Sequence, residues 1–126
     1  MKTEVSFFRC KHCGNIVGLI NNGGGTLVCC GEPMEELVPN TTDAAVEKHV
    51  PVAIRKDGKI HVEIGSVAHP MTEAHYIQWI AVVGEEGTER ISLAPSDEPK
   101  AVFCDKKNAE VYAYCNLHGL WKADVK

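Results

Sequence analysis

Four cysteines crowd the first quarter of the chain, in a segment too short to be stabilised by apolar burial alone. They form a Cys-x-x-Cys pair in "CKHC" and an adjacent pair in "VCCGEP", as Cys10, Cys13, Cys29 and Cys30. A polar linker follows, and we place a boundary near Pro39. A domain of about 38 residues usually needs a metal ion or disulfides in order to fold. The sequence therefore predicts a small metal-binding domain over residues 1–38.

Four thiolates around one cation make a tetrahedral site that suits zinc or iron, and the spacing leaves both metals open. Neighbouring side chains on a strand point to opposite faces, so Cys29 and Cys30 can share an ion only in a turn. The glycine and proline of "CCGEP" supply that turn. A structural zinc knuckle is the commoner use of such a set, and no βαβ pattern supports a thioredoxin-type redox pair. His12, inside the knuckle, is expected to be exposed and not a ligand.

Composition excludes several classes of protein. Hydrophobic residues make up 44% of the 126 residues, enough for a packed core, and the net charge is -4. No cluster of Lys and Arg is present that would neutralise nucleic-acid phosphates. No apolar run approaches the roughly 20 residues of a membrane span, and the first ten residues do not resemble a secretion signal. We expect a cytoplasmic protein with reduced thiols, because disulfides would require an oxidising compartment.

Residues 39–126 have patterns typical of strands joined by turns. The expected strands are 50–55, 59–64, 75–83, 89–94, 100–104 and 109–115. "KDG" and "GEEG" mark hairpins, and turn signals recur about every 8 to 12 residues. The pattern predicts a mostly β protein whose second part is an immunoglobulin-like sandwich. Residues 43–48, "DAAVEK", can form one helical turn at most.

Histidines and a second group of thiols occupy this β region. Five of them border β-like runs beside turn residues: His49, His69, His75, Cys115 and His118. Loops at one end of a sandwich cluster in space, so these side chains are expected to converge on one ion. A single thiolate with several imidazoles favours iron or copper over structural zinc. A blue-copper site usually has a methionine shortly after its last histidine, and "HGLW" contains none. His61 is expected to face solvent, and Cys104 to be an idle thiol.

Taken together, these motifs resemble desulfoferrodoxin, the two-iron form of superoxide reductase. "CKHCGNIV" and "VCCGEPM" are similar to its desulforedoxin-like front domain. "EKHVP", "GSVAHPM", His75 and "CNLHGLW" are similar to its catalytic domain, in the same order. The resemblance implies a rubredoxin-like FeCys4 centre in residues 1–38. In residues 39–126 it implies an Ig-like sandwich or barrel, with four histidines in a plane around a second iron. Cys115 would be the axial ligand of that iron, and the opposite face would be open.

The resemblance also implies a reaction, the one-electron reduction of superoxide to hydrogen peroxide. It further implies an electron donor such as rubredoxin and, commonly, a homodimer. An acidic protein repels an anion at long range, so local positive charge is needed, and we expect Lys48 to supply it. Glu47 would occupy the open position once the iron is ferric. The alternatives are a non-catalytic electron carrier with iron or copper, and a structural zinc protein with an incidental group of histidines.

Overall fold

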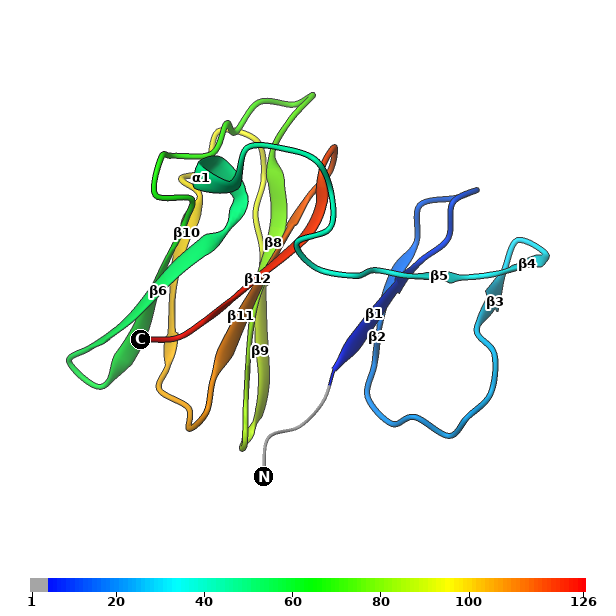
Figure 1. Ribbon diagram of the computed structural model, residues 1–126, viewed down its shortest axis with the longest axis horizontal. Helices are drawn as coiled ribbons and strands as arrows, with labels where there is room; N and C mark the ends of the chain where they lie inside the picture. The colour runs from blue at the N-terminus through cyan, green and yellow to red at the C-terminus, as the bar shows by residue number, and fades with distance from the viewer. Residues whose placement is uncertain (1–4) are drawn as a thin grey trace. The chain divides into compact units, whose positions relative to one another are not determined.

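The computed structural model describes residues 5–126, which divide into two compact units. The first unit ends at Val38 and the second begins at Pro39. Nearly all regular structure is β, as predicted, with a single helical turn (Figure 1). Within the described residues, no helix has the length and apolar character to cross a membrane.

The front unit consists of two small antiparallel sheets. Strands β1 (Ser6–Arg9), β2 (Ile16–Leu19) and β5 (Glu35–Glu36) form one sheet in the order β2-β1-β5, and β3 (Val28–Cys29) pairs with β4 (Glu32–Pro33). Among the described residues of this unit, Phe7 and Cys10 are the buried apolar side chains. So small a core cannot hold the fold by itself, in keeping with the need for a cross-link inferred from the sequence.

The second unit is an immunoglobulin-like sandwich, as predicted, in which a three-stranded sheet packs against a four-stranded sheet (Figure 1). The first sheet has the order β10-β7-β6, from Lys100–Cys104, Lys59–Ile64 and Pro51–Lys56. The second has the order β12-β11-β8-β9, from Gly119–Asp124, Glu110–Cys115, Ile77–Gly84 and Gly87–Ser92. Both sheets contribute to the core, which includes Ile60, Val62, Phe103, Ile80, Val82 and Val111.

Strand β7 shows why the alternating pattern correctly predicted which side chains of the strand are buried. In "KIHVEI" the residues Ile60, Val62 and Ile64 are buried, while His61 and Glu63 point to the other side. The preceding turn places Asp57 and Gly58 at φ +54° and +73°, the conformation that an Asp-Gly hairpin favours. The ranges predicted for β7 and β10 are those observed, and the other predicted strands end within two residues of the observed ones.

One end of the sandwich brings together three segments that are distant in sequence. The helical turn α1 (Val46–His49) lies there, three residues later than the predicted start at 43. The loop 65–76 is tied to α1, because the Val67 amide donates to the Glu47 carbonyl at 2.8 Å. The turn 116–118 is tied to the same loop, because the Asn116 amide donates to the Tyr76 carbonyl at 3.2 Å.

Candidate metal centres

The front unit gathers its four cysteines around one point. Their sulfur atoms all lie within 4.8 Å of one another, with 3.6 Å between Cys13 and Cys29 and 4.0 Å between Cys29 and Cys30. Sulfurs bound at about 2.3 Å to one tetrahedral ion are about 3.8 Å apart. All six cysteines of the chain are free thiols. The front cluster therefore has the dimensions of a four-thiolate metal site, not of a disulfide pair.

Two tight turns make this geometry possible. The Gly14 amide donates to the Cys10 carbonyl at 2.8 Å and closes the knuckle. Cys30 and Gly31 have φ +52° and +78° and form the two-residue turn between β3 and β4. The expectation that the adjacent cysteines need a turn is thus confirmed, because Cys29 ends a strand and Cys30 occupies the turn.

The thiols of the front cluster differ in pKa. Backbone N–H groups of Cys13 and His12 lower the pKa of Cys10 to about 6. Hydrogen bonds from the Cys13 and Cys10 side chains raise the pKa of Cys30 to about 12. Metal binding requires deprotonated sulfurs, so a bound cation favours the loss of the protons that these thiols carry without it. The donor set therefore fits Fe or Zn.

The second cluster lies at the end of the sandwich that contains α1. Single ligand atoms of His49, His69, His75 and Cys115 all lie within 4.8 Å of one another. His118 joins them, with its Nδ1 3.1 Å from His49 Nε2 and 3.9 Å from Cys115 Sγ. All five residues that the sequence grouped are therefore adjacent.

The four imidazole rings surround a common centre. In the order His49, His69, His75, His118, the centroids of neighbouring rings are 4.6, 4.7, 4.9 and, back to His49, 4.9 Å apart. The planes of neighbouring rings cross at 77° to 87°. The rings are thus arranged like blades around a common axis. Cys115, the last residue of β11, adds a sulfur to the same cluster.

Backbone carbonyls fix two of the rings. His49 Nδ1 donates to the Ala45 carbonyl at 2.7 Å, and His69 Nδ1 donates to the Pro70 carbonyl at 2.7 Å. Each bond leaves the Nε2 lone pair for the cluster, as second-shell contacts do for metal-binding histidines. Nε2 of His69 and of His75 is buried and has no hydrogen-bond partner among the described residues. Such orphaned atoms require an explanation, and a metal ion provides one.

Burial also sets the charge of these ligands. It lowers the pKa of His69 to about 4 and lowers the pKa of His49 and His75, so the imidazoles are neutral at neutral pH. Burial raises the pKa of the Cys115 thiol. A buried thiolate therefore needs a cation beside it, and neutral imidazoles are the form that binds metals.

Helix α1 presents two charged side chains beside the cluster. Glu47 and Lys48 are exposed and directly precede the buried His49. The positive charge of Lys48 contributes to the lowered pKa of both His49 and His75, which places it within electrostatic range of the site.

Gly65 allows the loop after β7 to pass directly against α1. Its φ is +83°, and a Cβ atom there would lie 2.3 Å from the Val67 carbonyl oxygen and 2.7 Å from that of Glu47. Glycine is required by both the conformation and the contact. Gly65 thereby helps to place the helix that carries Lys48 and His49.

Trp121 is a site residue that the sequence analysis did not assign. Its indole stacks on the His49 ring with centroids 4.9 Å apart, and its Nε1 donates to the His118 carbonyl at 3.1 Å. It is 1% exposed. The motif "HGLW" places an aromatic residue three positions after His118, which could have indicated a residue near the site. Its contact with His49 could not have been predicted, because His49 is distant in sequence.

The remaining candidate side chains lie away from both clusters. His12 is exposed, as expected, and its Nε2 contacts Glu32 at 3.1 Å. His61 is only half-buried, since it pairs with Ile54 and Val102 on the outer face of its sheet. Cys104 is exposed at the end of β10.

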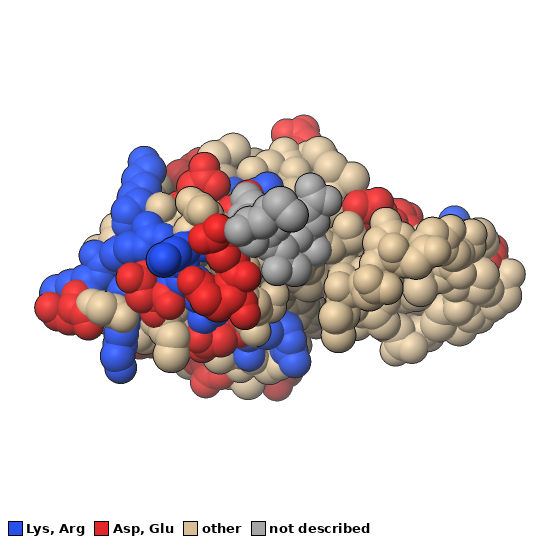
Figure 2. Space-filling model, turned by 90° about the horizontal axis from the view of Figure 1, so that it is seen from below, with Lys and Arg blue, Asp and Glu red and all other residues tan. Residues whose placement is uncertain are grey.

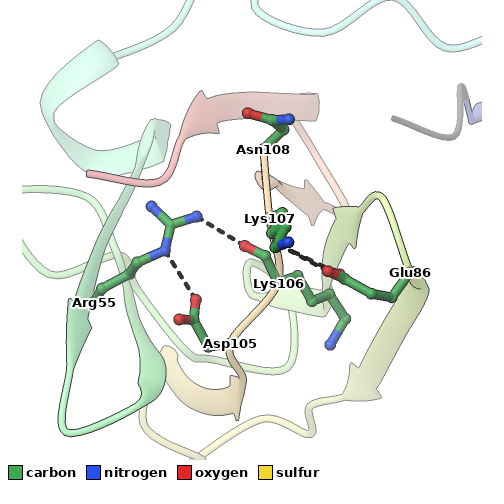
Figure 3. Close-up of a pocket in the computed structure, with 6 residues that line it drawn as sticks. All are labelled: Arg55, Glu86, Asp105, Lys106, Lys107 and Asn108. Carbon is green, nitrogen blue, oxygen red and sulfur yellow. Dashed lines mark hydrogen bonds and ion pairs between the residues drawn. The ribbon is translucent and has the colours of Figure 1, made fainter. Parts of the chain in front are cut away.

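The end of the sandwich opposite α1 has many charged side chains, and those of opposite sign lie close together. Acidic and basic side chains intermingle on this face (Figure 2). It contains a hollow of about 490 Å³, in which Arg55 donates to Asp105 and to the Lys106 carbonyl, both at 2.8 Å (Figure 3). The Lys107 amide donates to Glu86 at 3.2 Å. These contacts tie β6 to the β10–β11 loop, so the charges of the hollow serve the fold.

Comparisons with known proteins agree with both clusters. Residues 41–124 match the family model described as Desulfoferrodoxin, and residues 2–37 match the model of its N-terminal domain. The chain is 50% identical over 125 residues to a desulfoferrodoxin homolog of Archaeoglobus fulgidus, covering 96% of this chain and 98% of that protein. It is 48% identical over 126 residues to desulfoferrodoxin of Nitratidesulfovibrio vulgaris, covering 99% and 100%.

A solved structure extends the comparison to three dimensions. The crystal structure of the superoxide reductase from Treponema pallidum matches with a TM-score of 0.77 and 33% identity, over 95% of this chain and 98% of that one. Sequence, fold and clustered ligands thus point to the same conclusion: this chain belongs to the desulfoferrodoxin family.

Proposed function

We propose that this protein is a superoxide reductase. In this reaction superoxide takes up one electron and two protons and becomes hydrogen peroxide. The observation that carries the proposal is the convergence of four imidazoles and one thiol at one end of the sandwich, in a member of the desulfoferrodoxin family. Residues 1–38 form the electron-transfer domain, and residues 39–126 form the catalytic domain.

The two clusters are assigned to two iron ions. The front iron is held by Cys10, Cys13, Cys29 and Cys30, and the catalytic iron by His49, His69, His75, Cys115 and His118. The contacts around the rings select the donor atoms: Nε2 of the first three histidines and Nδ1 of His118. These five residues would hold the iron, and a small anionic substrate would bind to the ion beside them.

The donor set suits the reduction of a small anion. Ferrous iron supplies the electron when it is bound. Four neutral imidazoles add no negative charge, so the site stays positive and favours an anionic substrate. The Cys115 thiolate would add electron density to the bound iron, as thiolate ligands do in haem enzymes.

Lys48 and Glu47 are the charged residues that we assign to the reaction. The protein carries a net charge of -4, so superoxide needs local attraction. Lys48, which is exposed on α1, would supply this attraction and would stabilise the negative charge of the substrate. Glu47, the preceding residue, would serve as a ligand of the oxidised iron in the place of the substrate.

The stoichiometry of the reaction tests the proposal. With the iron-loaded protein and excess reductant, we expect one hydrogen peroxide for each superoxide consumed. Dismutation would give one for every two and release oxygen. The latter ratio, or no consumption by a protein that holds two irons, would refute the assignment.

The role of Lys48 has its own test and a matched control. Lys48→Ala should slow the capture of superoxide in pulse radiolysis and weaken its dependence on ionic strength. Lys56→Ala removes the same charge from the opposite end of β6, and should behave like the unaltered protein. Equal capture rates for the two variants at every ionic strength would remove Lys48 from the mechanism.

Several broader assignments accompany this function. We infer that an electron-transfer protein such as rubredoxin re-reduces the catalytic iron, and that the chain forms a homodimer. We also infer a cytoplasmic role in the detoxification of superoxide. Metal analysis tests the copper-carrier alternative, since a copper carrier would contain no iron. A non-catalytic iron carrier would be distinguished by its failure to consume superoxide.

A further inference from the structure

His75 differs from His49 and His69 in how its ring is held. His49 and His69 each fix their ring through Nδ1 and a backbone carbonyl. The buried Nε2 of His75 faces the cluster without a hydrogen-bond partner in the described chain, and the residue lies in the long loop between β7 and β8. Its ring position therefore depends on its backbone.

The side chain of Asn116 forms hydrogen bonds to the backbone on both sides of His75. Its Oδ1 accepts a hydrogen bond from the Tyr76 amide at 2.9 Å, and its Nδ2 donates to the Ala74 carbonyl at 3.0 Å. The Asn116 amide also donates to the Tyr76 carbonyl at 3.2 Å. Three hydrogen bonds from one residue thus fix the two neighbours of His75.

Asn116 is also covalently joined to Cys115. The pairing of β11 with β8 shifts register at this point, with Tyr114 opposite Trp79 but Cys115 opposite Ile77. Bulges of this kind often re-aim a side chain beside a site. The bonds of Asn116 continue the pairing after the shift, so the sulfur and the His75 loop are held at a fixed spacing.

We propose that Asn116 is a positioning residue that holds His75 in place relative to Cys115, and thereby sets the geometry of the five-ligand site. This inference rests on the proposed function, because it takes His75 and Cys115 as ligands of one iron. Asn116 itself touches neither the ion nor the substrate. Loss of a hydrogen bond made directly to a metal ligand typically weakens metal binding about 10- to 100-fold. The bonds of Asn116 act one residue away from His75, so we expect an effect near the lower end of this range.

A second asparagine provides the matched control. Asn40 Oδ1 accepts from the Lys122 amide at 2.9 Å, and its Nδ2 donates to the Lys122 carbonyl at 3.1 Å. It makes the same pair of bonds in the same unit, but not to the loop of His75. Because Asn40 has φ +62°, glycine is the replacement that removes the bonds without strain.

The experiment compares Asn116→Ala with Asn40→Gly in the full-length, iron-loaded protein. Release of the catalytic iron to a chelator is followed by the Cys115-to-iron absorption band, which is separate from the bands of the front centre. The thermal unfolding temperature is measured alongside. We expect both variants to lose stability. Only Asn116→Ala should release this iron about 10-fold faster or more and shift the band. If Asn116→Ala fails to fold, Asn116→Ser, which keeps one hydroxyl for the loop, should show a smaller change in the same direction.

Two results would overturn the inference, and they are distinguishable. If the Asn116 variants keep the release rate and band of the unaltered protein, or change no more than Asn40→Gly, Asn116 serves only the fold. If the unaltered, iron-loaded protein shows only the bands of the front centre and no Cys115-to-iron band, the proposed function fails and the inference fails with it.

Discussion

Substitution of Gly65 by alanine tests how closely the loop after β7 must pack against α1. A Cβ atom there would lie 2.3 Å from the Val67 carbonyl oxygen and 2.7 Å from the Glu47 carbonyl oxygen. Ordinary contacts begin near 3.4 Å, so the loop or the helix must move by about 1 Å. Both obstacles are backbone atoms and cannot rotate away. Because α1 ends at His49, the displacement reaches a ligand.

The cost has two parts. The left-handed backbone costs a residue with a side chain roughly 1–2 kcal/mol. Overpacking of a tight contact adds about 1–3 kcal/mol. We therefore expect Gly65→Ala to lower the free energy of unfolding by about 2–5 kcal/mol, from a typical total of about 5–15 kcal/mol. A displacement of about 1 Å at a catalytic group can slow a reaction about 100-fold, so superoxide capture should fall by about 10- to 100-fold.

Gly58→Ala is the matched control for this prediction. Gly58 has φ +73°, and no atom lies within 4 Å of a Cβ built there, so only the backbone cost remains. Urea unfolding followed by the fluorescence of Trp79 and Trp121 reports on the second unit, and pulse radiolysis gives the capture rate. Equal losses of stability for the two variants, with equal capture rates, would refute the argument from the contact with α1.

Three further predictions address the fold and the two clusters. Lys106 is nearly buried, and its ion pair with Glu89 lowers the pKa of that carboxyl in the folded protein. The pair therefore stabilises the fold fully above the pKa of an unfolded glutamate, about 4.3. This stabilisation is lost as the pH falls through the lower pKa of Glu89 in the folded protein. Lys106→Met should therefore reduce the loss of unfolding free energy between neutral and acidic pH, and an unaltered pH profile in urea titrations would contradict this. Trp121→Phe removes the donor to the His118 carbonyl and should speed iron release and shift the sulfur-to-iron band, whereas identical spectra and rates would exclude this role. Cys13→Ser should abolish the absorption of the front centre while superoxide reduction continues, and background-level reduction by a folded variant would show that the front iron is obligatory.

The front cluster could largely be predicted from the sequence because its four cysteines form two pairs of residues that are close in the chain. Cys10 and Cys13 lie in one turn, and the glycine after Cys30 signals the second turn. The five strands of this unit escaped prediction. They have two to four residues each, too few for an alternating pattern to appear.

The strands of the sandwich could be predicted where apolar and polar residues alternate regularly, and the prediction was wrong where they do not. Strand β12, Gly119–Asp124, was missed because "GLWKAD" shows two adjacent apolar residues rather than alternation. Helix α1 is displaced from the predicted residues because one helical turn has no period to detect and its position is fixed by Gly65 and Val67.

The second cluster shows the limit of motif reading. Ligand-type residues beside turns identified the five side chains that the fold brings together. The residues that orient them, Trp121 and Asn116, act on partners distant in the chain, His49 and the loop of His75. Tertiary contacts of this kind leave no local pattern, so only the three-dimensional structure reveals them.

The central claim is that five side chains from α1, the β7–β8 loop, β11 and its following turn bind one iron. Diffraction data from crystals of the iron-loaded protein, collected at the iron absorption edge, test it most directly. The account predicts an anomalous peak at bonding distance, about 2.0–2.4 Å, from Nε2 of His49, His69 and His75, Nδ1 of His118 and Sγ of Cys115. A peak that lacks the Cys115 sulfur, or no peak among the four rings, would contradict it.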